Sequence, residues 1–352
     1  MTAMQYGTQP LDPALEIRSN LTKWFDGKPR LTFKASSVRS AKAWQRRARA
    51  RFMECLGPPP KQVPLRRHVL ERQQMDGYHR TTFTLTTAPH LKALCWLCIP
   101  DSVTAHTPRP AMIATPGHGI GAKDLLAMDM KGNLRTEGRG YQKDYALQVV
   151  RLGYPVLVVE PLGFGERRDR ELLHEPTARS GCHAAATLAI FFGTTLASIR
   201  IHDLRRSLDF LCTVPQVRPD RIGLMGISGG GQLSLWAAAI DPRFKLAVVS
   251  GYLNKYRDAL MPIRHCICNF IPNLPRELDM SDLATLIAPR PILFENGTKD
   301  RHFPIKHSRG AMRQVRQNYR VFEADDRLKH DVFAGEHQWS GRRLPQFLRK
   351  WL

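Results

Sequence analysis

The sequence predicts an α/β protein with a mostly parallel central sheet, helices on both faces of that sheet, and antiparallel strands at its N-terminal edge. Two patterns carry this prediction. From Ala111 onward, short segments that are apolar throughout alternate with helix-length segments, which is typical of a parallel sheet covered on both faces. Before that point, three strand-like runs follow one another without a helix between them, which indicates strands joined by hairpins.

The N-terminal part divides at a proline-rich stop. Residues 1–60 predict a helical extension that ends at Gly57 and the three prolines after it. Residues 61–352 then form the main domain, which opens with alternating runs at 68–78, 81–87 and 91–99. Asp76-Gly77 separates the first two runs and is a hairpin signal.

Five apolar runs supply the expected parallel strands, at 112–115, 155–160, 221–227, 245–250 and 291–295. Helix-length segments lie between them, at about 140–151, 185–213, 230–240 and 307–318. The region 252–289 is longer than an ordinary connection and rich in Pro, Cys and His. Such a segment is typical of a cap or insertion over an active site, although a structural excursion has the same appearance.

The composition is that of a globular chain of 352 residues, with 43% hydrophobic and 24% charged residues. These proportions exclude a disordered polycation. The sequence holds no uncharged apolar run of about 18 residues, so we expect no membrane-spanning helix. The first residues show no secretory or transit signal, and seven cysteines do not suggest a disulfide framework. We therefore expect a cytoplasmic protein.

The net charge is strongly positive, because 53 Lys and Arg stand against 31 Asp and Glu and give +22. Residues 1–70 hold 14 basic and 4 acidic residues, which is +10 of this total. The densest run, 39–51, suits a nucleic-acid patch. It also suits a solvated helix face with Trp44, Ala48 and Phe52 turned inward, which we favour. The charge then serves solubility or attracts an anionic substrate.

The most informative motif is Gly-Ile-Ser-Gly-Gly at 226–230, directly after an apolar strand and directly before a helix-like run. This G-x-S-x-G pattern in a strand–turn–helix setting is typical of a nucleophile elbow. The flanking glycines let the strand and helix approach closely, and Ser228 is then held out at the carboxyl edge of the sheet. A glycine-rich turn that only binds an anion is the alternative interpretation.

A serine hydroxyl is a weak nucleophile and needs a base, which in turn needs an orienting acid. In this topology the chain order is Ser, acid, His. Asp300 follows the strand at 291–295, and His337 follows the apolar segment at 332–334. Both fall at carboxyl ends of strands, where open α/β sheets gather functional groups.

Other residues compete for these roles. Glu295 is an alternative acid, but it lies inside its strand rather than beyond it. The alternative bases are His330, His302 and His307. His330 is expected before its strand, and the other two accompany the acid loop or open a helix, so we favour Asp300 and His337.

An oxyanion needs two donors. The backbone N–H of Gly229 supplies the first, and the turn at 116–121, which contains three glycines, supplies the second. We favour the backbone N–H of His118 as this second donor. A plain tight turn is the alternative.

These motifs resemble the α/β-hydrolase superfamily, and within it the acetyl xylan esterase-like and dienelactone hydrolase-like proteins. The resemblance covers roughly residues 110–352. It implies a carboxylic ester hydrolase that works through an acyl-enzyme, with Ser228, Asp300 and His337 as its triad, a short acyl substrate and no cofactor. At two positions this chain has residues that differ from those of many relatives. They are Pro116-Gly117 at the expected oxyanion turn and Glu160 at the end of the strand at 155–160.

Substrate contacts are expected from the 252–289 insertion and from the loop after the triad histidine. The candidates are Tyr252, Cys268, Phe270 and Trp339. His265, Cys266 and Cys268 invite a metal interpretation, but no second Cys/His pair with suitable spacing appears nearby. We therefore expect no metal here, and packing or pocket roles for these side chains. Cys95 and Cys98 are expected to pack on opposite faces of one strand.

Two other functions stay open. A prolyl-oligopeptidase-type peptidase shares the triad order, but about 110 residues before the hydrolase core are too few for its usual propeller. A basic nucleic-acid-binding or interaction protein on a hydrolase scaffold fits the charge but not the intact triad. The expected partner is a small ester, with an anionic ester and a second copy of the chain left open as further options. We expect no membrane, and nucleic acid is disfavoured.

Overall fold

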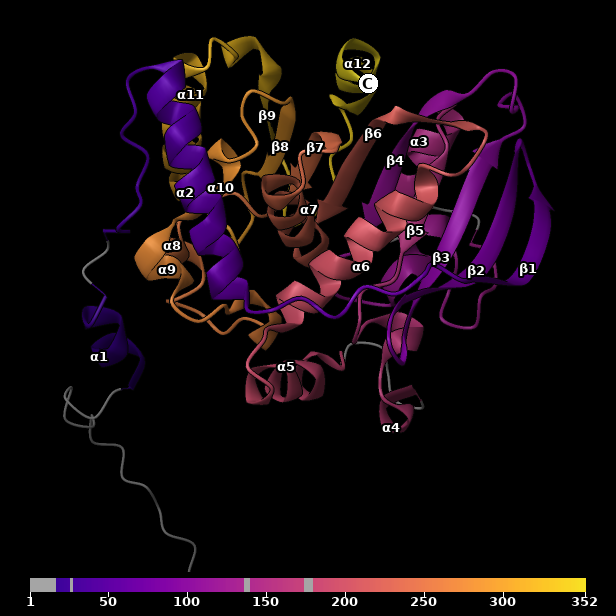
Figure 1. Cartoon of the computed structure of the whole chain (residues 1–352), viewed down its shortest axis with the longest axis horizontal. Coiled ribbons are helices and arrows are strands. Elements are labelled where there is room, and N and C mark those ends of the chain that lie inside the picture. Colours follow the sequence, from indigo (N-terminus) through magenta and orange to yellow (C-terminus); the bar gives the residue numbers. More distant parts are fainter. Residues whose placement is uncertain (1–16, 26–27, 136–139, 174–179) are drawn as a thin grey trace, which may run out of the picture.

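The computed structural model describes residues 17–25, 28–135, 140–173 and 180–352. Its centre is a nine-stranded sheet with the order β1-β2-β3-β5-β4-β6-β7-β8-β9 (Figure 1). The strands are β1 (Arg67–Met75), β2 (Tyr78–Ala88), β3 (Leu91–Pro100), β4 (Arg109–Thr115), β5 (Val156–Val159), β6 (Val217–Ile227), β7 (Phe244–Ser250), β8 (Ile292–Gly297) and β9 (Leu328–Phe333).

The sheet has an antiparallel edge and a parallel body, as predicted. β1, β2 and β3 form antiparallel hairpins, and Asp76-Gly77 closes the first, where Met75 pairs with Tyr78. β3 pairs antiparallel with β5, whereas every pair from β5 through β4 to β9 is parallel. The carboxyl ends of the parallel strands therefore meet along one edge, and the candidate site lies there.

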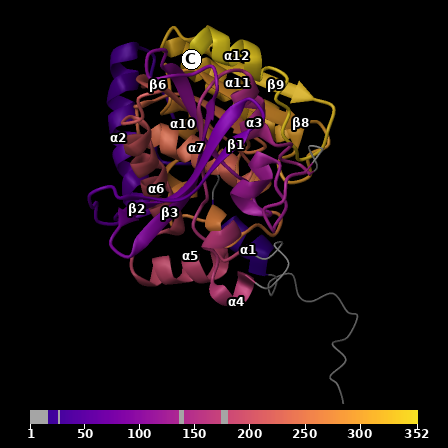
Figure 2. The ribbon, with the colours of Figure 1, turned by 90° about the vertical axis from the view of Figure 1, so that its right-hand side faces the viewer.

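Helices cover both faces. They are α1 (Ile17–Lys23), α2 (Val38–Leu56), α3 (Tyr145–Arg151), α4 (Arg170–Leu173), α5 (Cys182–Phe191), α6 (Leu196–Leu211), α7 (Gly229–Ile240), α8 (Tyr256–Ala259), α9 (Leu274–Glu277), α10 (Met280–Thr285), α11 (Ile305–Val321) and α12 (Leu344–Trp351). Alternate strand residues enter two separate cores, one beneath α2, α6, α7, α10 and α11 and one beneath α3 and α12. Cys95 belongs to the first core and Cys98 to the second, as expected. Figure 2 shows α2 and α6 on one side of the sheet and α3 on the other.

The N-terminal helix α2 is part of the hydrophobic core. Ser37 caps its N-terminus, and the helix ends at Leu56 with Gly57 in a positive-φ conformation. Trp44, Ala48 and Phe52 are buried, which confirms the predicted inward stripe. The basic run of α2 therefore has an apolar face against the core and a charged face outward.

The expected helix at 185–213 is wrong in one respect, because the segment forms two helices. α5 and α6 are separated by a turn at Gly193, which has φ of +77°. In the part of the chain that the structure describes, no single helix has the length and apolar character needed to cross a membrane; only the bent pair of α5 and α6, taken together, meets that test of length and composition.

Candidate active site

Ser228 lies at the turn between β6 and α7. Its backbone has φ of 55° and ψ of −120°, a conformation that L-residues adopt only when the surroundings impose it. The Ser228 N–H donates to Ser250 O at 2.9 Å, which ties the turn to β7. A Cβ on Gly226 would collide with the Gly230 backbone, and one on Gly230 with Thr115 O. The two glycines thus let β6, α7 and β4 approach closely enough to present Ser228.

Asp300 and His337 meet above this turn, although 37 residues separate them in the chain. His337 Nδ1 lies 2.7 Å from Asp300 Oδ2. The other carboxylate oxygen, Oδ1, accepts the backbone N–H groups of His302 at 2.8 Å and Phe303 at 3.0 Å. Asp300 is buried, so these bonds hold its carboxylate in one orientation, aimed at the imidazole.

The His337 imidazole is confined on several sides. The ring of Phe303 stacks at 5.9 Å and that of Tyr141 at 5.8 Å. Gly251, with φ of +58°, leaves room for it, since a Cβ there would lie 2.9 Å from His337 Cε1. This packing fixes the plane of the His337 imidazole.

The competing acids and bases are held elsewhere. Glu295 is fully buried within β8 and accepts the N–H groups of Gly341 at 2.9 Å and Ser340 at 3.2 Å. Burial raises its pKa to about 7. His307 lies 3.1 Å from Asp258.

His330 corrects one detail of the sequence interpretation, because it lies inside β9 rather than before it. Its Nε2 is 3.0 Å from Asn296 Oδ1, and burial lowers its pKa to about 4. His302 lies in the site, with its ring 4.9 Å from that of His337. Burial lowers the pKa of His302 too, so it is a neutral neighbour of the base at neutral pH.

The turn after β4 lies opposite the elbow. Its Gly117 N–H is already used, since it donates to Gln142 Oε1 at 2.8 Å. Tyr141 Oη donates to His118 O at 2.5 Å and so orients the following peptide. The His118 ring lies beside Gly229, since a Cβ on Gly229 would be 3.1 Å from both Nδ1 and Cε1. The two expected oxyanion donors therefore belong to adjacent segments.

A cavity of about 450 Å³ joins these groups. Its lining is made of Ser228, Gly229, His118, His337, Tyr141, Tyr252, Arg264, His265, Cys266, Asn269, His302 and Phe303. The described lining contains an arginine and no carboxylate. The insertion at 252–289 contributes five of these twelve residues, so it forms one wall of the site.

Three of the four expected substrate-binding residues, Trp339, Phe270 and Cys268, do not line this cavity. Trp339 is fully buried and stacks on Tyr145 at 4.2 Å, because its loop turns into the core after His337. Phe270 is 47% exposed and borders a separate small cavity. Tyr252 does line the cavity, and its hydroxyl accepts from Gln232 Nε2 at 2.8 Å. Cys268 lies behind His118, with Sγ 3.3 Å from His118 Nε2.

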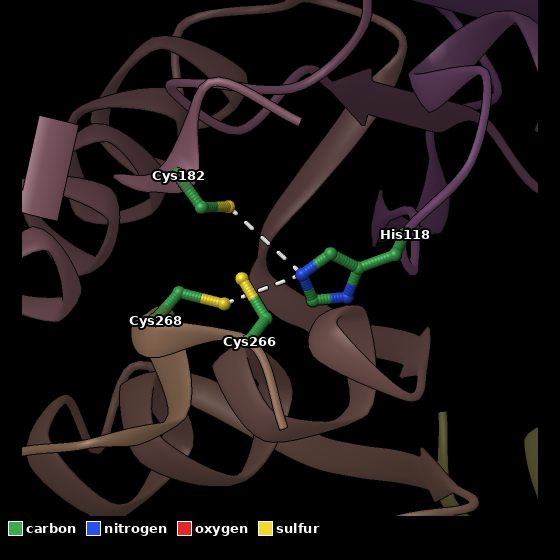
Figure 3. A group of neighbouring side chains, drawn as sticks. All are labelled: His118, Cys182, Cys266 and Cys268. Carbon is green, nitrogen blue, oxygen red and sulfur yellow. Dashed lines mark hydrogen bonds between the residues drawn. The ribbon is translucent and has the colours of Figure 1, made fainter. Parts of the chain in front are cut away.

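Four potential ligands gather at this wall. We call them the Cys–His cluster: His118, Cys182, Cys266 and Cys268 (Figure 3). Each offers one ligand atom, and these four atoms all lie within 4.8 Å of one another. Asp300, His302 and His337 form the other such group in the described chain, but two of them, Asp300 and His337, are hydrogen-bonded to each other. The sequence argument against a metal failed to find the Cys–His cluster, because His118 and Cys268 are 150 positions apart.

The Cys–His cluster lowers the pKa of one of its thiols, whereas an apolar core would raise it. Hydrogen bonds from Cys266 and Cys268 lower the pKa of Cys182 well below its usual range, and the charge of Arg200 adds to this. Arg200 is itself buried and donates to Cys182 Sγ at 3.1 Å. These contacts favour the thiolate form of Cys182 over its thiol form.

The parallel sheet, the serine elbow and the Asp–His pair at its carboxyl edge define an α/β-hydrolase. The chain belongs to the Abhydrolase family, whose model matches residues 21–350. That match begins well before residue 110, so it includes α2 and the antiparallel strands.

Known proteins agree with this fold. The chain is 27% identical to the candidate hydrolase YtaP of Bacillus subtilis (strain 168) over 314 residues, 86% of this chain and 98% of YtaP. A candidate acetyl xylan esterase of Bacteroides fragilis superposes with a TM-score of 0.80 at 18% identity, covering 96% of this chain and 95% of that one. A glucuronoyl esterase of Solibacter usitatus gives a TM-score of 0.62 at 16% identity, covering 89% and 96%.

Proposed function

We propose that this protein is a serine hydrolase that cleaves a carboxylic ester through an acyl-enzyme intermediate. The observation that carries the proposal is the Asp300–His337 hydrogen bond beside the Ser228 elbow, within one cavity. A buried carboxylate that accepts from Nδ1 holds the imidazole with Nε2 free to act as a base. His337 then takes the proton from Ser228 Oγ as that oxygen attacks the ester carbonyl.

The negative charge that develops on the carbonyl oxygen needs donors in place beforehand. Gly229 lies at the N-terminus of the twelve-residue helix α7, where N–H groups point outward. We assign its N–H and that of His118 to the oxyanion. His337 next protonates the leaving alcohol, and finally activates the water that releases the acid and frees Ser228.

The cavity supports a short acyl group and an anionic or carbohydrate ester. Its volume of about 450 Å³ is modest. Arg264 faces it without a carboxylate in the described lining to neutralise its charge, and the whole chain carries +22. Similar structures include acetyl xylan esterases and glucuronoyl esterases, which favours sugar esters. We also infer a reducing compartment, because all seven cysteines are free.

The decisive experiment is a panel of acyl-nitrophenol esters from about two to twelve carbons with the wild type and Ser228→Ala. We expect turnover to be highest for the shortest chains and to fall at least about a thousandfold in Ser228→Ala. Ser234→Ala is the matched control, since Ser234 lies on the same helix and its hydroxyl has no hydrogen-bond partner among the described residues. If Ser228→Ala retained activity close to that of Ser234→Ala, the mechanism would be wrong.

The same assay separates the alternatives. Amide turnover equal to ester turnover would favour a peptidase, although the described residues before β4 form only α1, α2 and three edge strands. Nucleic-acid binding is disfavoured because the basic run of α2 is partly used internally. Arg49 donates to the Ala239 and Leu286 carbonyls, and Arg51 pairs with Glu54 and Glu277. Absence of DNA binding at low salt would exclude that role.

A further inference from the structure

We propose that the Cys–His cluster is a structural zinc site that anchors the oxyanion turn and the insertion to each other. Its four side chains come from three separate parts of the fold. His118 follows β4, Cys182 opens α5, and Cys266 and Cys268 flank the start of the short 3-10 helix Ile267–Asn269. Figure 3 shows the His118 ring directed toward the cysteine side chains.

The ligand set is the one that zinc prefers. Three thiolates and one imidazole make a closed tetrahedral Cys₃His site, and zinc binds sulfur at about 2.3 Å and nitrogen at about 2.0 Å. In a tetrahedron of these bond lengths, sulfur and nitrogen ligands are about 3.6 Å apart and two sulfurs about 3.8 Å apart. His118 Nε2 lies 3.3 Å from Cys268 Sγ and 3.9 Å from Cys182 Sγ, which brackets that separation.

The surroundings suit a charged metal complex. Three thiolates around Zn²⁺ leave a net charge of −1, which needs a positive neighbour when it is buried. Arg200 is 2% exposed and donates to Cys182 Sγ at 3.1 Å. Its guanidinium is held in place by Leu162 O at 2.9 Å and lies over the Phe164 ring at 4.5 Å. Cys182 also begins the ten-residue helix α5, whose N-terminus favours a negative sulfur.

The site explains how three segments are held at the cavity. The hydrophobic cluster at this corner is small: among the described residues its buried members are Phe164, Cys182, Ala186, Leu196 and Cys268, and two of these five are the proposed ligands themselves. A zinc ion at this point joins α5, the Cys266–Cys268 segment and the turn of His118. The protein fills all four coordination positions, so the metal has none open for substrate. Its role is to position His118 and Cys266 beside Ser228 and Gly229.

Metal analysis of the purified protein tests the proposal directly. After purification without chelator, or after anaerobic reduction and dialysis against zinc, we expect one zinc ion per chain. X-ray absorption at the zinc edge is expected to show three sulfur ligands and one nitrogen ligand. This measurement uses the wild type, so it is informative even if a variant does not fold.

Variants then assign the ligands. Cys182→Ser and Cys266→Ser should each lower the zinc content to background and lower the melting temperature. A chelator should lower the melting temperature of the wild type but not of these variants. Cys212→Ser is the matched control, because Cys212 is a half-buried free cysteine outside the cluster. It should keep the full zinc content.

Three results would overturn the proposal. The first is that the reduced wild type binds no zinc after dialysis. The second is an X-ray absorption spectrum without sulfur ligands. The third is a disulfide among Cys182, Cys266 and Cys268, found by peptide mapping of protein prepared under reducing conditions. None of these readouts depends on ester hydrolysis. The zinc site therefore stands or fails separately from the proposed esterase activity.

Discussion

The proposed triad and the Cys–His cluster lie at the same edge of the sheet, but they are built in opposite ways. Ser228, Asp300 and His337 each follow the end of a parallel strand, so the sheet itself brings them together. The four members of the Cys–His cluster lie on loops and helix starts that only tertiary packing brings within 4.8 Å. Strand order thus determines the position of Ser228, whereas the cavity wall depends on contacts made by the insertion and α5.

The largest expected effect is on the triad acid. Asp300→Asn keeps the shape of the side chain but replaces an acceptor with an amide that can donate to His337 Nδ1, which favours the wrong tautomer. We expect kcat to fall by about 10³–10⁴-fold, with little change in stability. Steady-state kinetics and thermal unfolding of the same samples measure both quantities.

Glu295→Gln is the control for Asp300→Asn, because Glu295 was the alternative acid and is bonded to the Ser340 and Gly341 N–H groups instead. We expect a change in kcat below about tenfold. A large loss in Glu295→Gln together with a small loss in Asp300→Asn would reverse the assignment of the acid.

The next effect concerns the elbow. In Gly230→Ala the new methyl group would collide with Thr115 O, and backbone cannot move aside as a side chain can. We expect a loss of at least about 3 kcal/mol in the free energy of unfolding, or no folded protein. Gly310→Ala is the contrasting variant, since its Cβ would find only Arg313 Nη2, at 3.8 Å, on helix α11. It should stabilise the protein by up to about 1 kcal/mol. Equal denaturant midpoints for the two variants would contradict this account.

A third comparison tests whether Arg200, the cation beside the Cys–His cluster, compensates a buried negative charge there. Arg200→Gln removes the buried guanidinium beside Cys182, and we expect a loss of about 3–5 kcal/mol in the free energy of unfolding. Arg205→Gln is the control on the same helix. Arg205 is 40% exposed and pairs with Asp241 at 3.1 Å, so its loss should cost about 1 kcal/mol or less. Urea unfolding of both variants checks the difference, and similar losses would mean that Arg200 does not compensate a buried charge.

Most of the fold could be predicted from the sequence, because parallel strands are apolar throughout. The positions of Ser228, Asp300 and His337 at the carboxyl edge could be predicted too, since each follows a strand, while their catalytic roles stay a prediction. Trp339 could not be placed, since the direction of the loop after His337 is decided by packing against Tyr145 rather than by local residues. Phe270 could not be placed either, because no local pattern shows that its side chain is half exposed beside a small separate cavity. The Cys–His cluster was missed for the same reason. Its signal in the sequence is an isolated Cys-x-Cys, and the other two ligands come from segments that no spacing rule connects to it.

Glu160 provides the most specific test and the smallest effect per pH unit, because strand order predicts its position but not its protonation. It follows β5, is fully buried, and accepts the Ala122 N–H at 3.0 Å. Burial raises its pKa to about 8, above the 4.5 of an unfolded chain. Between these values the folded state holds one more proton than the unfolded state, so stability falls as pH rises.

For one proton, this fall is at most about 1.4 kcal/mol per pH unit between pH 5 and 8. Glu160→Gln removes the titration while keeping an acceptor for Ala122. The free energy of unfolding should therefore decline less steeply with pH in the variant than in the wild type. Glu295 and Asp282 have pKa values raised in the same direction, but both remain in the variant and cancel in the difference. Denaturant titrations of both proteins at pH 5, 6, 7 and 8 measure this difference in the slope of stability against pH. Parallel pH profiles for the two proteins would show that Glu160 is ionised in the folded state, where the charges of Arg167 and Lys123 oppose the effect of burial.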